Sequence, residues 1–323
     1  MPDTMLLSDA DVERLLEPAA LLDELRRAMI AYSSDGGPRA QRSHSDIPGG
    51  APHSVMLVFP GVVPGIPAYT VKINSKRPDA TPSVRGLIAL IDVESGAPLA
   101  VMDSIVITRL RTALVGALAA DAMARETVSS VAVIGAGVQG RAQLRALRLV
   151  RRFDTVRVYD RVPERAAALV AELRGELRAE MSVTPSVRAA AAGADVIIVA
   201  TWATAPVLFA DMVAPGAHVT TIGADEPGKA ELDAELIRHS RFICDDADLA
   251  VQMGALAGAG LGPECVHATL GDVLAGRRPG RLTAADVTVF GSVGLPCQDL
   301  PAAWMAYGKA ATARTSTFTF HGA

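Results

Sequence analysis

The chain contains few of the residues that mark disulfide-rich or metal-binding proteins. Its three cysteines, Cys244, Cys265 and Cys297, are odd in number, widely spaced and without histidines at ligand spacing. This pattern argues against a disulfide framework and against a zinc site. The six histidines form no pair at the helical i, i+4 spacing. We therefore expect reduced, mostly buried thiols and no bound metal.

Long uncharged apolar runs and blocks of one charge are also missing. No segment approaches the roughly eighteen apolar residues of a membrane helix, and residues 1–16 carry acids where a signal peptide needs positive charge. The 31 basic and 35 acidic residues are interspersed, so the net charge of −4 provides no basic stripe and no polybasic anchor. We expect a cytoplasmic protein that binds a small molecule, not a nucleic acid or a membrane.

The apolar content and the length are those of an enzyme-sized globular protein. Half of the 323 residues are apolar and one fifth are charged, which is enough for two domains with separate cores. Two helices are predicted at the start, the first with a capping box of Ser8 and Asp11. Short β-rich runs between residues 54 and 101, with a hairpin turn at residues 94–96, predict a mostly antiparallel sheet.

The second half of the chain has a different pattern. A helix rich in small residues is predicted from residue 105 to about residue 125, and strands then alternate with helices. This alternation predicts a parallel, doubly wound sheet, and a final helix beginning near residue 300 returns to the first domain. The predicted fold class is α/β. It combines a Rossmann-type domain at residues 119–299 with an α+β domain at residues 1–118 and 300–323.

A glycine motif marks the start of the predicted Rossmann domain. In VAVIGAGVQG, a β-branched run leads directly into Gly135, Gly137 and Gly140, and Asp160 follows twenty residues later, after a second strand. The first glycine permits a tight turn, the second a close approach of amides to a pyrophosphate, and the third helix–sheet packing. The helix N-terminus then favours the anion. We predict a dinucleotide site here.

Asp160 also indicates which dinucleotide binds. A carboxylate at this position accepts hydrogen bonds from a ribose 2′-hydroxyl and repels a 2′-phosphate, which favours NAD(H). Arg161 is the next residue, and a guanidinium there could pair with a phosphate. NADP(H) therefore stays open.

Charged residues in both domains are candidates for the chemistry. Lys72 lies in the middle of the predicted strand AYTVKIN, and the alternative is a solvated lysine on an edge strand. Arg111 and Arg109 share a helix, and we expect one of the two to face the interior and the other to be exposed. At Arg111, a guanidinium that faces the interior could bind a carboxylate, or it could form a salt bridge at the domain junction. Asp225 follows the strand HVTTIGA, where doubly wound sheets bind ligands, or it caps a helix.

Five motifs follow one another along the chain: LAVMDSIVITRLRTALVGALAA, VAVIGAGVQG, VIIVATWATAPVLF, PGAHVTTIGADEPGKAELD and VTVFGSVGLPCQD. In this order they resemble the ornithine cyclodeaminase and mu-crystallin family from about residue 35 to residue 310. The resemblance implies a homodimer, with substrate binding and dimerisation in the α+β domain and a nicotinamide dinucleotide in the Rossmann domain.

The resemblance also implies roles for individual residues. It makes Lys72, Asp225 and Arg111 catalytic. It also implies that Lys72 and Arg111 bind substrate, Arg111 through the carboxylate. The second carboxylate clamp falls on Arg39, with Arg42 as the alternative. Val293 corresponds to the loop residue that touches substrate. The residues implied at the cofactor are Gly135, Gly137, Val138, Gln139, Asp160, Arg161, Thr112 and Thr201.

One departure from the family pattern concerns the substrate. Ornithine cyclodeaminases carry a glutamate suited to ornithine's distal ammonium where this chain has Leu57. An unpaired buried ammonium costs several kcal/mol, on the order of 100-fold or more in affinity. This favours a substrate with an uncharged tail, although Asp46 could replace the missing acid.

The leading hypothesis is an NAD(P)H-dependent reductase of small imino acids, such as pyrroline-2-carboxylate or piperideine-2-carboxylate. Ornithine cyclodeamination to proline with catalytic NAD+ is the first alternative. Alanine dehydrogenase or opine-type chemistry is another. A mu-crystallin-like protein that holds nicotinamide and a ligand without turnover is the alternative from a different class.

Overall fold

The structure is a computed structural model that describes residues 3–34, 42–51, 54–78, 80–311 and 315–320. It divides into two units, of which unit 1 comprises Met1–Arg111 with Leu295–Ala323 and unit 2 comprises Thr112–Gly294. Helix α3 (Ile105–Met123) contains the first boundary. The sequence places the boundaries a few residues later, at 118/119 and 299/300.

Unit 1 is built on one sheet. Its strands are β1 (Thr4–Leu7), β2 (Ser43–Asp46), β3 (Val55–Gly61), β4 (Ala68–Lys76), β5 (Val84–Asp92), β6 (Pro98–Asp103) and β17 (Ser316–Phe318). Within the described part of the chain they form a seven-stranded sheet in the order β17-β1-β6-β5-β4-β3-β2. Only the β1–β6 pairing among these strands is parallel, so the prediction of a mostly antiparallel sheet is confirmed.

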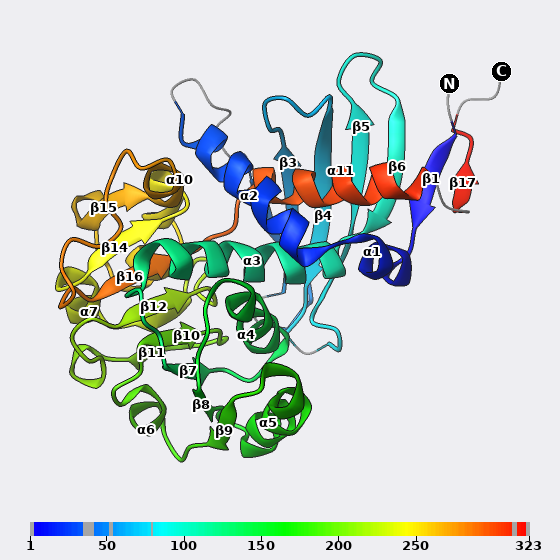
Figure 1. Ribbon diagram of the computed structural model, residues 1–323. Coiled ribbons are helices and arrows are strands. Elements are labelled where there is room, and N and C mark those ends of the chain that lie inside the picture. Colours follow the sequence, from blue (N-terminus) through cyan, green and yellow to red (C-terminus); the bar gives the residue numbers. More distant parts are fainter. Residues whose placement is uncertain (1–2, 35–41, 52–53, 79, 312–314, 321–323) are drawn as a thin grey trace. The chain divides into compact units, whose positions relative to one another are not determined.

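The helices of unit 1 pack on one face of this sheet. They are α1 (Asp9–Leu15), α2 (Pro18–Tyr32), the short 3-10 helix η3 (Pro296–Gln298) and α11 (Asp299–Ala310). Helix α11 crosses β4, β5 and β6, and α2 packs against α11 (Figure 1). The return of the final helix to the first domain is thereby confirmed.

The start of the chain differs from the prediction of two helices. The capping box of Ser8 and Asp11 is present at α1, but strand β1 precedes it and pairs with β6 and β17. Four residues carry too short a pattern to indicate a strand, and both partner strands are distant in sequence. The turn at residues 94–96 joins β5 to β6 as expected, with Gly96 at φ +70°.

Strand β4 has one face toward the helices and one away from them. The residues at alternate positions, among them Thr70, Lys72 and Asn74, are buried. Ile73, between the last two, is 48 % exposed. Because the side chains of a strand alternate between its faces, one face of β4 is polar and enclosed, and the other is apolar and open.

Unit 2 contains the parallel sheet. Its strands are β7 (Ser130–Ile134), β8 (Thr155–Tyr159), β9 (Glu180–Val183), β10 (Val196–Val199), β12 (His218–Thr221), β14 (Arg241–Cys244), β15 (Val266–Thr269) and β16 (Thr288–Gly291). Among the described residues they form an eight-stranded sheet in the order β15-β14-β16-β12-β10-β7-β8-β9, parallel throughout. A pair of short strands, β11 (Thr204–Leu208) and β13 (Ala230–Leu232), forms a separate parallel ladder.

Helices cover both faces of this parallel sheet. They are α4 (Val138–Val150), α5 (Pro163–Leu177), α6 (Val187–Ala191), α7 (Ala234–Arg238), α8 (Ala247–Ala250), α9 (Gly254–Gly258) and α10 (Leu270–Leu274), with 3-10 turns η1 (Ala210–Met212) and η2 (Pro263–Cys265). On β7, Val131 and Val133 pack with α4 and α5, and Ala132 and Ile134 pack with α6 and α7. The chain therefore has the predicted α/β class, with a doubly wound Rossmann-type sheet.

The strand order places a switch point in the middle of the sheet. From β7 the chain continues through β8 to β9 on one side, and from β10 through β12 on the other. Ligands of open α/β sheets bind beyond the carboxyl ends of the strands at such a reversal. In unit 2 these ends are Ile134 of β7 and Val199 of β10.

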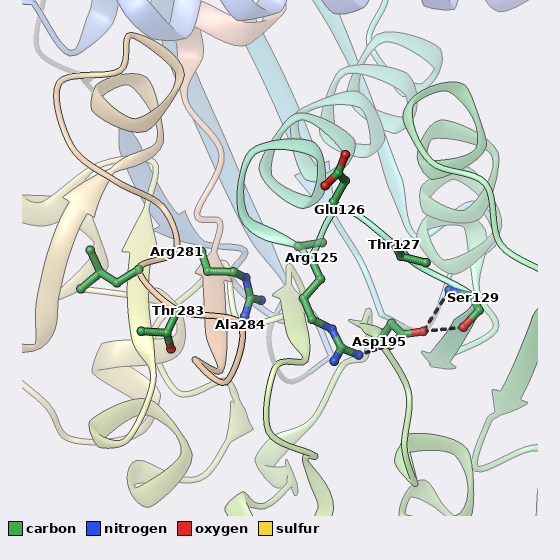
Figure 2. Close-up of a pocket in the computed structure, with 10 residues that line it drawn as sticks. Arg125, Glu126, Thr127, Ser129, Asp195, Arg281, Thr283 and Ala284 are labelled. Carbon is green, nitrogen blue, oxygen red and sulfur yellow. Dashed lines mark hydrogen bonds and ion pairs between the residues drawn. The ribbon is translucent and has the colours of Figure 1, made fainter.

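A pocket of about 640 Å³ lies at the opposite, amino-terminal edge of the same sheet. It includes Ser129, directly before β7, and Asp195, directly before β10. Figure 2 shows Arg125 and Ser129 meeting at the Asp195 carboxylate. The described residues that line this pocket include none of the predicted site residues. Nor does any helix in the described ranges have the length and apolar character needed to cross a membrane.

Candidate functional site

Lys72 occupies a central position in unit 1. Its strand β4 pairs along its length with β3 on one side and β5 on the other, so it is not an edge strand. The Lys72 side chain is 2 % exposed. The reading of Lys72 as a solvated edge lysine is therefore excluded.

The partner of Lys72 is a residue that the sequence analysis did not single out. The Lys72 Nζ atom lies 2.6 Å from Oδ2 of Asp299, which is 1 % exposed and is the first residue of α11. Arg111 Nε donates a hydrogen bond of 3.1 Å to the other oxygen, Oδ1. Arg111 Nη1 also donates to Oε1 of Gln298 at 2.7 Å. One buried carboxylate thus joins both of the predicted cations.

The two arginines of α3 separate as expected. Arg111 is buried, whereas Arg109 is partly exposed and pairs with Glu13 on α1. The alternative reading of Arg111, a salt bridge, is confirmed by its ion pair with Asp299. That ion pair leaves the cluster with more cations than anions. The binding of a substrate carboxylate by Arg111 stays a prediction.

A third cation reaches the same place. The guanidinium carbon of Arg42 lies 5.0 Å from the centre of the Phe59 ring, and Lys72 Nζ lies 4.6 Å from that centre. Phe59 stands opposite Lys72 in the β3–β4 ladder. Of the two candidates for the second carboxylate clamp, Arg39 lies outside the described residues. Lys72 and Arg111 share the one carboxylate of Asp299, which leaves an excess of positive charge, and Arg42 completes the cluster of Lys72, Arg42, Arg111 and Asp299.

Burial changes the acidity of Lys72. Removal of the ammonium from water lowers the pKa of Lys72 from 10.5 to about 7, against the opposing attraction of Asp299. Arg111 and Arg42 lower this pKa further through repulsion. A lysine with a pKa near neutrality can both donate and accept a proton at physiological pH.

Leu57 lies on the same face of the sheet as the cationic cluster. It is 1 % exposed and stands opposite Asn74, two residues along β4 from Lys72. With Val55 and Phe59 it forms a small buried apolar cluster. Asp46, the acid considered as a replacement, lies on β2 and is exposed. Position 57 therefore adds a buried apolar side chain, and no acid, to this face.

In unit 2 the glycine motif has the geometry that the sequence predicts. Gly135 has φ +101°, and a Cβ atom there would lie 2.3 Å from the carbonyl oxygen of Ala200. A Cβ atom at Gly140 would lie 2.1 Å from the carbonyl oxygen of Gly135. A Cβ atom at Gly137 would contact nothing within 4 Å. The turn is therefore tight at its first and third glycines and open at the second.

The first turn of α4 offers groups to an anionic ligand. Gly137 is the N-cap of α4 and provides no side-chain cap, so amides of the first turn have no side-chain acceptor there. Val138 is 61 % exposed. The buried Oε1 atom of Gln139 has no hydrogen-bond partner among the described residues. An open cradle with an unsatisfied buried acceptor fits the pyrophosphate and hydroxyls of a dinucleotide.

Asp160 directly follows β8, as predicted. Its Oδ2 accepts a hydrogen bond of 2.8 Å from the Ala136 amide, and its Oδ1 accepts one of 2.9 Å from the Val162 amide. Each carboxylate oxygen can accept more than one hydrogen bond, so ribose hydroxyls remain possible donors. Arg161 is exposed. The positions of both residues are compatible with either choice of dinucleotide.

The other residues assigned to the cofactor have defined surroundings. Thr112 on α3 accepts a hydrogen bond at its carbonyl from Gln143 of α4, at 3.1 Å. Thr201, two residues after β10, donates from its amide and its hydroxyl to Oε1 of Glu231, at 2.6 and 2.8 Å. A Cβ atom at Gly135 would lie 3.2 Å from Thr201 Cγ2. The turn carrying Thr201 therefore packs directly against the glycine turn.

Asp225 lies in the loop after β12 and does not cap a helix. Its Oδ1 pairs with Lys229 Nζ at 2.9 Å, and the side chain is 28 % exposed. Lys229 lies 4.2 Å from the centre of the Trp202 ring. Burial lowers the pKa of Lys229, but the carboxylates of Asp225 and Glu226 outweigh it, so this pKa is raised overall. Lys229 stays charged beside Asp225.

Val293 lies in a loop that the buried acid Asp245 of unit 2 holds. The Asp245 carboxylate accepts hydrogen bonds from the amides of Val293 and Gly294 and from the hydroxyl of Ser292, at 2.8 to 3.1 Å. Burial raises the pKa of Asp245. The loop after β16 that carries Val293 is therefore fixed in place.

The sequence analysis missed the acids that hold these residues. The acid Asp299 and its neighbour, the amide Gln298, lie within the quoted string VTVFGSVGLPCQD. The acid Glu231 lies within PGAHVTTIGADEPGKAELD. The one available signal was the position of an acid inside an otherwise apolar segment, such as Asp299 in LPCQDLPAAW. An acid in such a segment needs a buried partner, because an unpaired charge would destabilise the core.

Comparison with known proteins places the chain among enzymes of one family. A sequence profile described as "Ornithine cyclodeaminase/mu-crystallin family" matches residues 2–314. The mouse (Mus musculus) ketimine reductase mu-crystallin is 33 % identical over 93 % of this chain and 96 % of its own length.

Two solved structures extend the comparison. An archaeal alanine dehydrogenase dimer with bound NAD has a TM-score of 0.92 at 30 % identity, with 99 % of this chain and all of that chain covered. The Thermococcus litoralis Δ1-pyrroline-2-carboxylate reductase, in complex with NADH and L-proline, has a TM-score of 0.91 at 29 % identity. That match covers 98 % of this chain and 100 % of the other.

The close packing at Gly140 predicts the effect of one added methyl group. In Gly140→Ala the Cβ atom would meet the backbone oxygen of Gly135, so the start of α4 must move. We expect NADH to bind at least about tenfold more weakly, measured by titration of its fluorescence. Gly175→Ala on α5 is the control, because a Cβ atom there meets nothing within 4 Å. Wild-type affinity in Gly140→Ala would exclude the glycine turn as the binding site.

Proposed function

The chain belongs to the ornithine cyclodeaminase and mu-crystallin family, and we propose that it is an NAD(P)H-dependent reductase of small cyclic imino acids. The substrates in this proposal are ketimine carboxylates such as pyrroline-2-carboxylate or piperideine-2-carboxylate. The observation that carries it is the buried group of Lys72, Arg111 and Asp299, in which two cations share one carboxylate and the lysine has a pKa of about 7, with the partly buried Arg42 beside it. The apolar Leu57 on the same face favours an uncharged ring.

The relatives support this chemistry. The mouse relative is named a ketimine reductase, and the Thermococcus litoralis relative is a reductase of pyrroline-2-carboxylate. The alanine dehydrogenase relative also acts on an amino acid. A reaction at the carbon–nitrogen bond next to a carboxylate is common to these three named activities.

The residues of unit 2 that would hold the cofactor are those of the glycine turn. Gly137 and the first-turn amides of α4 would bind the pyrophosphate, and Asp160 would accept hydrogen bonds from the adenosine ribose. Asp160 favours NADH over NADPH, because a 2′-phosphate would approach its negative charge. When bound, the reduced nicotinamide supplies a hydride to the imine carbon.

Arginine side chains would bind the substrate carboxylate. The described hydrogen bonds of Arg111 use Nε, which donates to Asp299, and Nη1, which donates to Gln298. Its Nη2 group would donate to the substrate carboxylate. Arg42 belongs to the same cluster and would provide the second cation. A carboxylate in this position neutralises the excess positive charge and gains charge-assisted hydrogen bonds.

Lys72 would control the proton on the substrate nitrogen. A neutral imine becomes more electrophilic when its nitrogen is protonated, and the Lys72 ammonium is the acid in the cluster with a pKa of about 7. The proton moves from Lys72 Nζ to the ring nitrogen, and the neutral lysine then remains beside Asp299. In the reverse direction neutral Lys72 accepts that proton.

Asp225 would supply negative charge to the iminium form of the substrate. Its pairing with Lys229 holds the carboxylate in one orientation. A fixed carboxylate stabilises a developing cation without reorganisation during the reaction.

The proposal includes a homodimer formed by unit 1. The face of its sheet that points away from α11 exposes Met56, Ile73 and Leu87 by 49, 48 and 40 %. Val58, Ile73 and Leu87 are directly paired across β3, β4 and β5, so their side chains form one row. An exposed apolar area of this kind indicates an interface. The archaeal relative is a dimer.

The proposed activity predicts the outcome of a direct assay. With pyrroline-2-carboxylate or piperideine-2-carboxylate, the protein should consume NADH and form proline or pipecolate. Lys72→Met should lower kcat by about 10²–10⁴-fold, because it removes the proton donor, with unchanged NADH affinity, because Lys72 lies outside the glycine turn proposed to hold the dinucleotide. An equal loss of kcat and of NADH affinity would contradict the role of Lys72. If the protein formed proline and ammonia from ornithine with catalytic NAD+, it would be a cyclodeaminase. If it formed pyruvate from alanine, it would be an alanine dehydrogenase. Tight NADH binding without any turnover would indicate a binding protein.

The pKa of Lys72 predicts the pH dependence of that assay. For imine reduction the lysine must carry a proton, so kcat/KM should be constant below about pH 7 and fall about tenfold per pH unit above it. The oxidation of proline requires neutral Lys72, so its kcat/KM should rise up to about pH 7 and then stay constant.

A variant separates this ionisation from that of the substrate. Asp299→Asn removes the charge that raises the pKa of Lys72, so the fall in kcat/KM should move to lower pH. The ionisation of free substrate cannot respond to a change in the protein. A fall at unchanged pH in a folded Asp299→Asn protein, judged by circular dichroism, would assign the profile to the substrate.

The exposed row predicts how the dimer can be dissociated. The double substitution Ile73→Lys and Leu87→Lys places two charges on the apolar face, and we expect a monomer by light scattering after size-exclusion chromatography. Leu149→Lys is the control, since Leu149 is 48 % exposed on α4 of unit 2. A dimer that persists in the double variant would place the interface elsewhere.

A further inference from the structure

We propose that Glu231 is a positioning residue for the dinucleotide site, because its buried carboxylate holds the turn after β10 in place against the glycine turn after β7. This inference rests on the proposed cofactor function of unit 2. It assigns a role to a residue that neither the glycine motif nor the cluster around Lys72 contains.

The Glu231 carboxylate accepts four hydrogen bonds from two different turns. Its Oε1 accepts from the amide and the hydroxyl of Thr201, at 2.6 and 2.8 Å. Its Oε2 accepts from the hydroxyl of Thr221 at 2.6 Å and from the amide of Gly223 at 2.8 Å. Thr201 follows β10, whereas Thr221 ends β12 and Gly223 follows it. A single side chain of β13 therefore ties together the carboxyl ends of two neighbouring strands.

This connection reaches the glycine turn through Thr201. A Cβ atom at Gly135 would lie 2.3 Å from the carbonyl oxygen of Ala200 and 3.2 Å from Cγ2 of Thr201. The segment of Ala200 and Thr201 is thus one wall of the turn at Gly135. Because β7 and β10 flank the switch point of the sheet, this wall borders the region where a dinucleotide binds.

The four donors require a carboxylate. Oε1 accepts the amide hydrogen of Thr201 and Oε2 that of Gly223, and a backbone amide cannot reverse its role. A glutamine has the same shape, but its NH2 group must face one of these two amides, donor against donor. Glu231 is 0 % exposed, so water cannot replace the lost acceptor. The substitution Glu231→Gln therefore releases one of the two turns.

The test is the affinity of the full-length protein for NADH, measured by fluorescence titration and by calorimetry. Glu231→Gln should weaken NADH binding by about 10- to 100-fold, since one buried hydrogen bond to a charged acceptor is lost and the wall of the turn moves. In the imine assay the KM for NADH should rise by the same factor, with kcat at saturating NADH within about threefold of wild type. A fall in kcat at constant KM would overturn the proposal.

Asp195→Asn is the matched control. Asp195 is 8 % exposed; its Oδ2 accepts hydrogen bonds from the amides and hydroxyls of Ser129 and Ser130, at 2.9 to 3.1 Å, and its Oδ1 pairs with Arg125. Asp195 directly precedes β10 at the amino-terminal edge of the same sheet, whereas the glycine turn follows β7 at the opposite edge. In Asp195→Asn the side-chain oxygen can keep the Oδ2 position, so this variant loses the buried charge and the ion pair with Arg125. We expect a lower melting temperature and wild-type affinity for NADH. An equal loss of affinity in both variants would assign the effect to general destabilisation.

A milder variant covers the case in which Glu231→Gln does not fold. Thr201→Val removes one donor to Glu231 and retains the backbone amide, so it should weaken NADH binding by a factor of about 2 to 10. Wild-type affinity in whichever variant folds would refute the positioning role. If the wild-type protein itself bound no NADH, the proposed function would fail, which is a different result from equal binding by wild type and variant.

Discussion

The buried carboxylate of Asp299 is the constraint on which the arrangement of unit 1 depends. A lysine that is 2 % exposed and an arginine beside it would repel each other strongly without an anion between them. Each buried ion costs several kcal/mol of desolvation, which only a well-placed partner offsets. Asp299 offsets part of this cost for both cations. The cluster nevertheless keeps an excess of positive charge, so it is prepared for one more negative group.

Buried carboxylates also organise unit 2, where their partners are uncharged donors. Glu231 and Asp245 are buried carboxylates whose partners are mainly amides and hydroxyls of turns at the carboxyl ends of the strands. In both cases a buried acid converts a flexible turn into a fixed one, because its donors have no alternative acceptor in the interior. Parallel strands supply the rigid framework, and the acids determine the shape of the turns that follow them.

What the sequence could predict depended on how local each signal is. The glycine turn, helix α4 and Asp160 belong to one βαβ unit, so residues 131–160 alone defined them. The burial of Lys72 depends on β3 and β5, and its partner Asp299 comes from the other end of the chain. Arg111 and Asp299 are 188 residues apart in sequence. No periodicity reports such a pairing, which is why the charged residues were found and the acid that holds them was missed.

The excess of charge also bears on the choice of substrate under the proposed function. A substrate with one carboxylate and an apolar ring brings one negative charge to the cluster of Lys72, Arg42 and Arg111. Ornithine brings in addition a distal ammonium, which these cations repel and which Leu57 cannot bind, since Leu57 is 1 % exposed and apolar. The positive charge of the cluster thus both attracts the carboxylate and repels the ammonium. An acid at position 57 would relieve both penalties at once, because it would pair with the ammonium and reduce the positive charge around it.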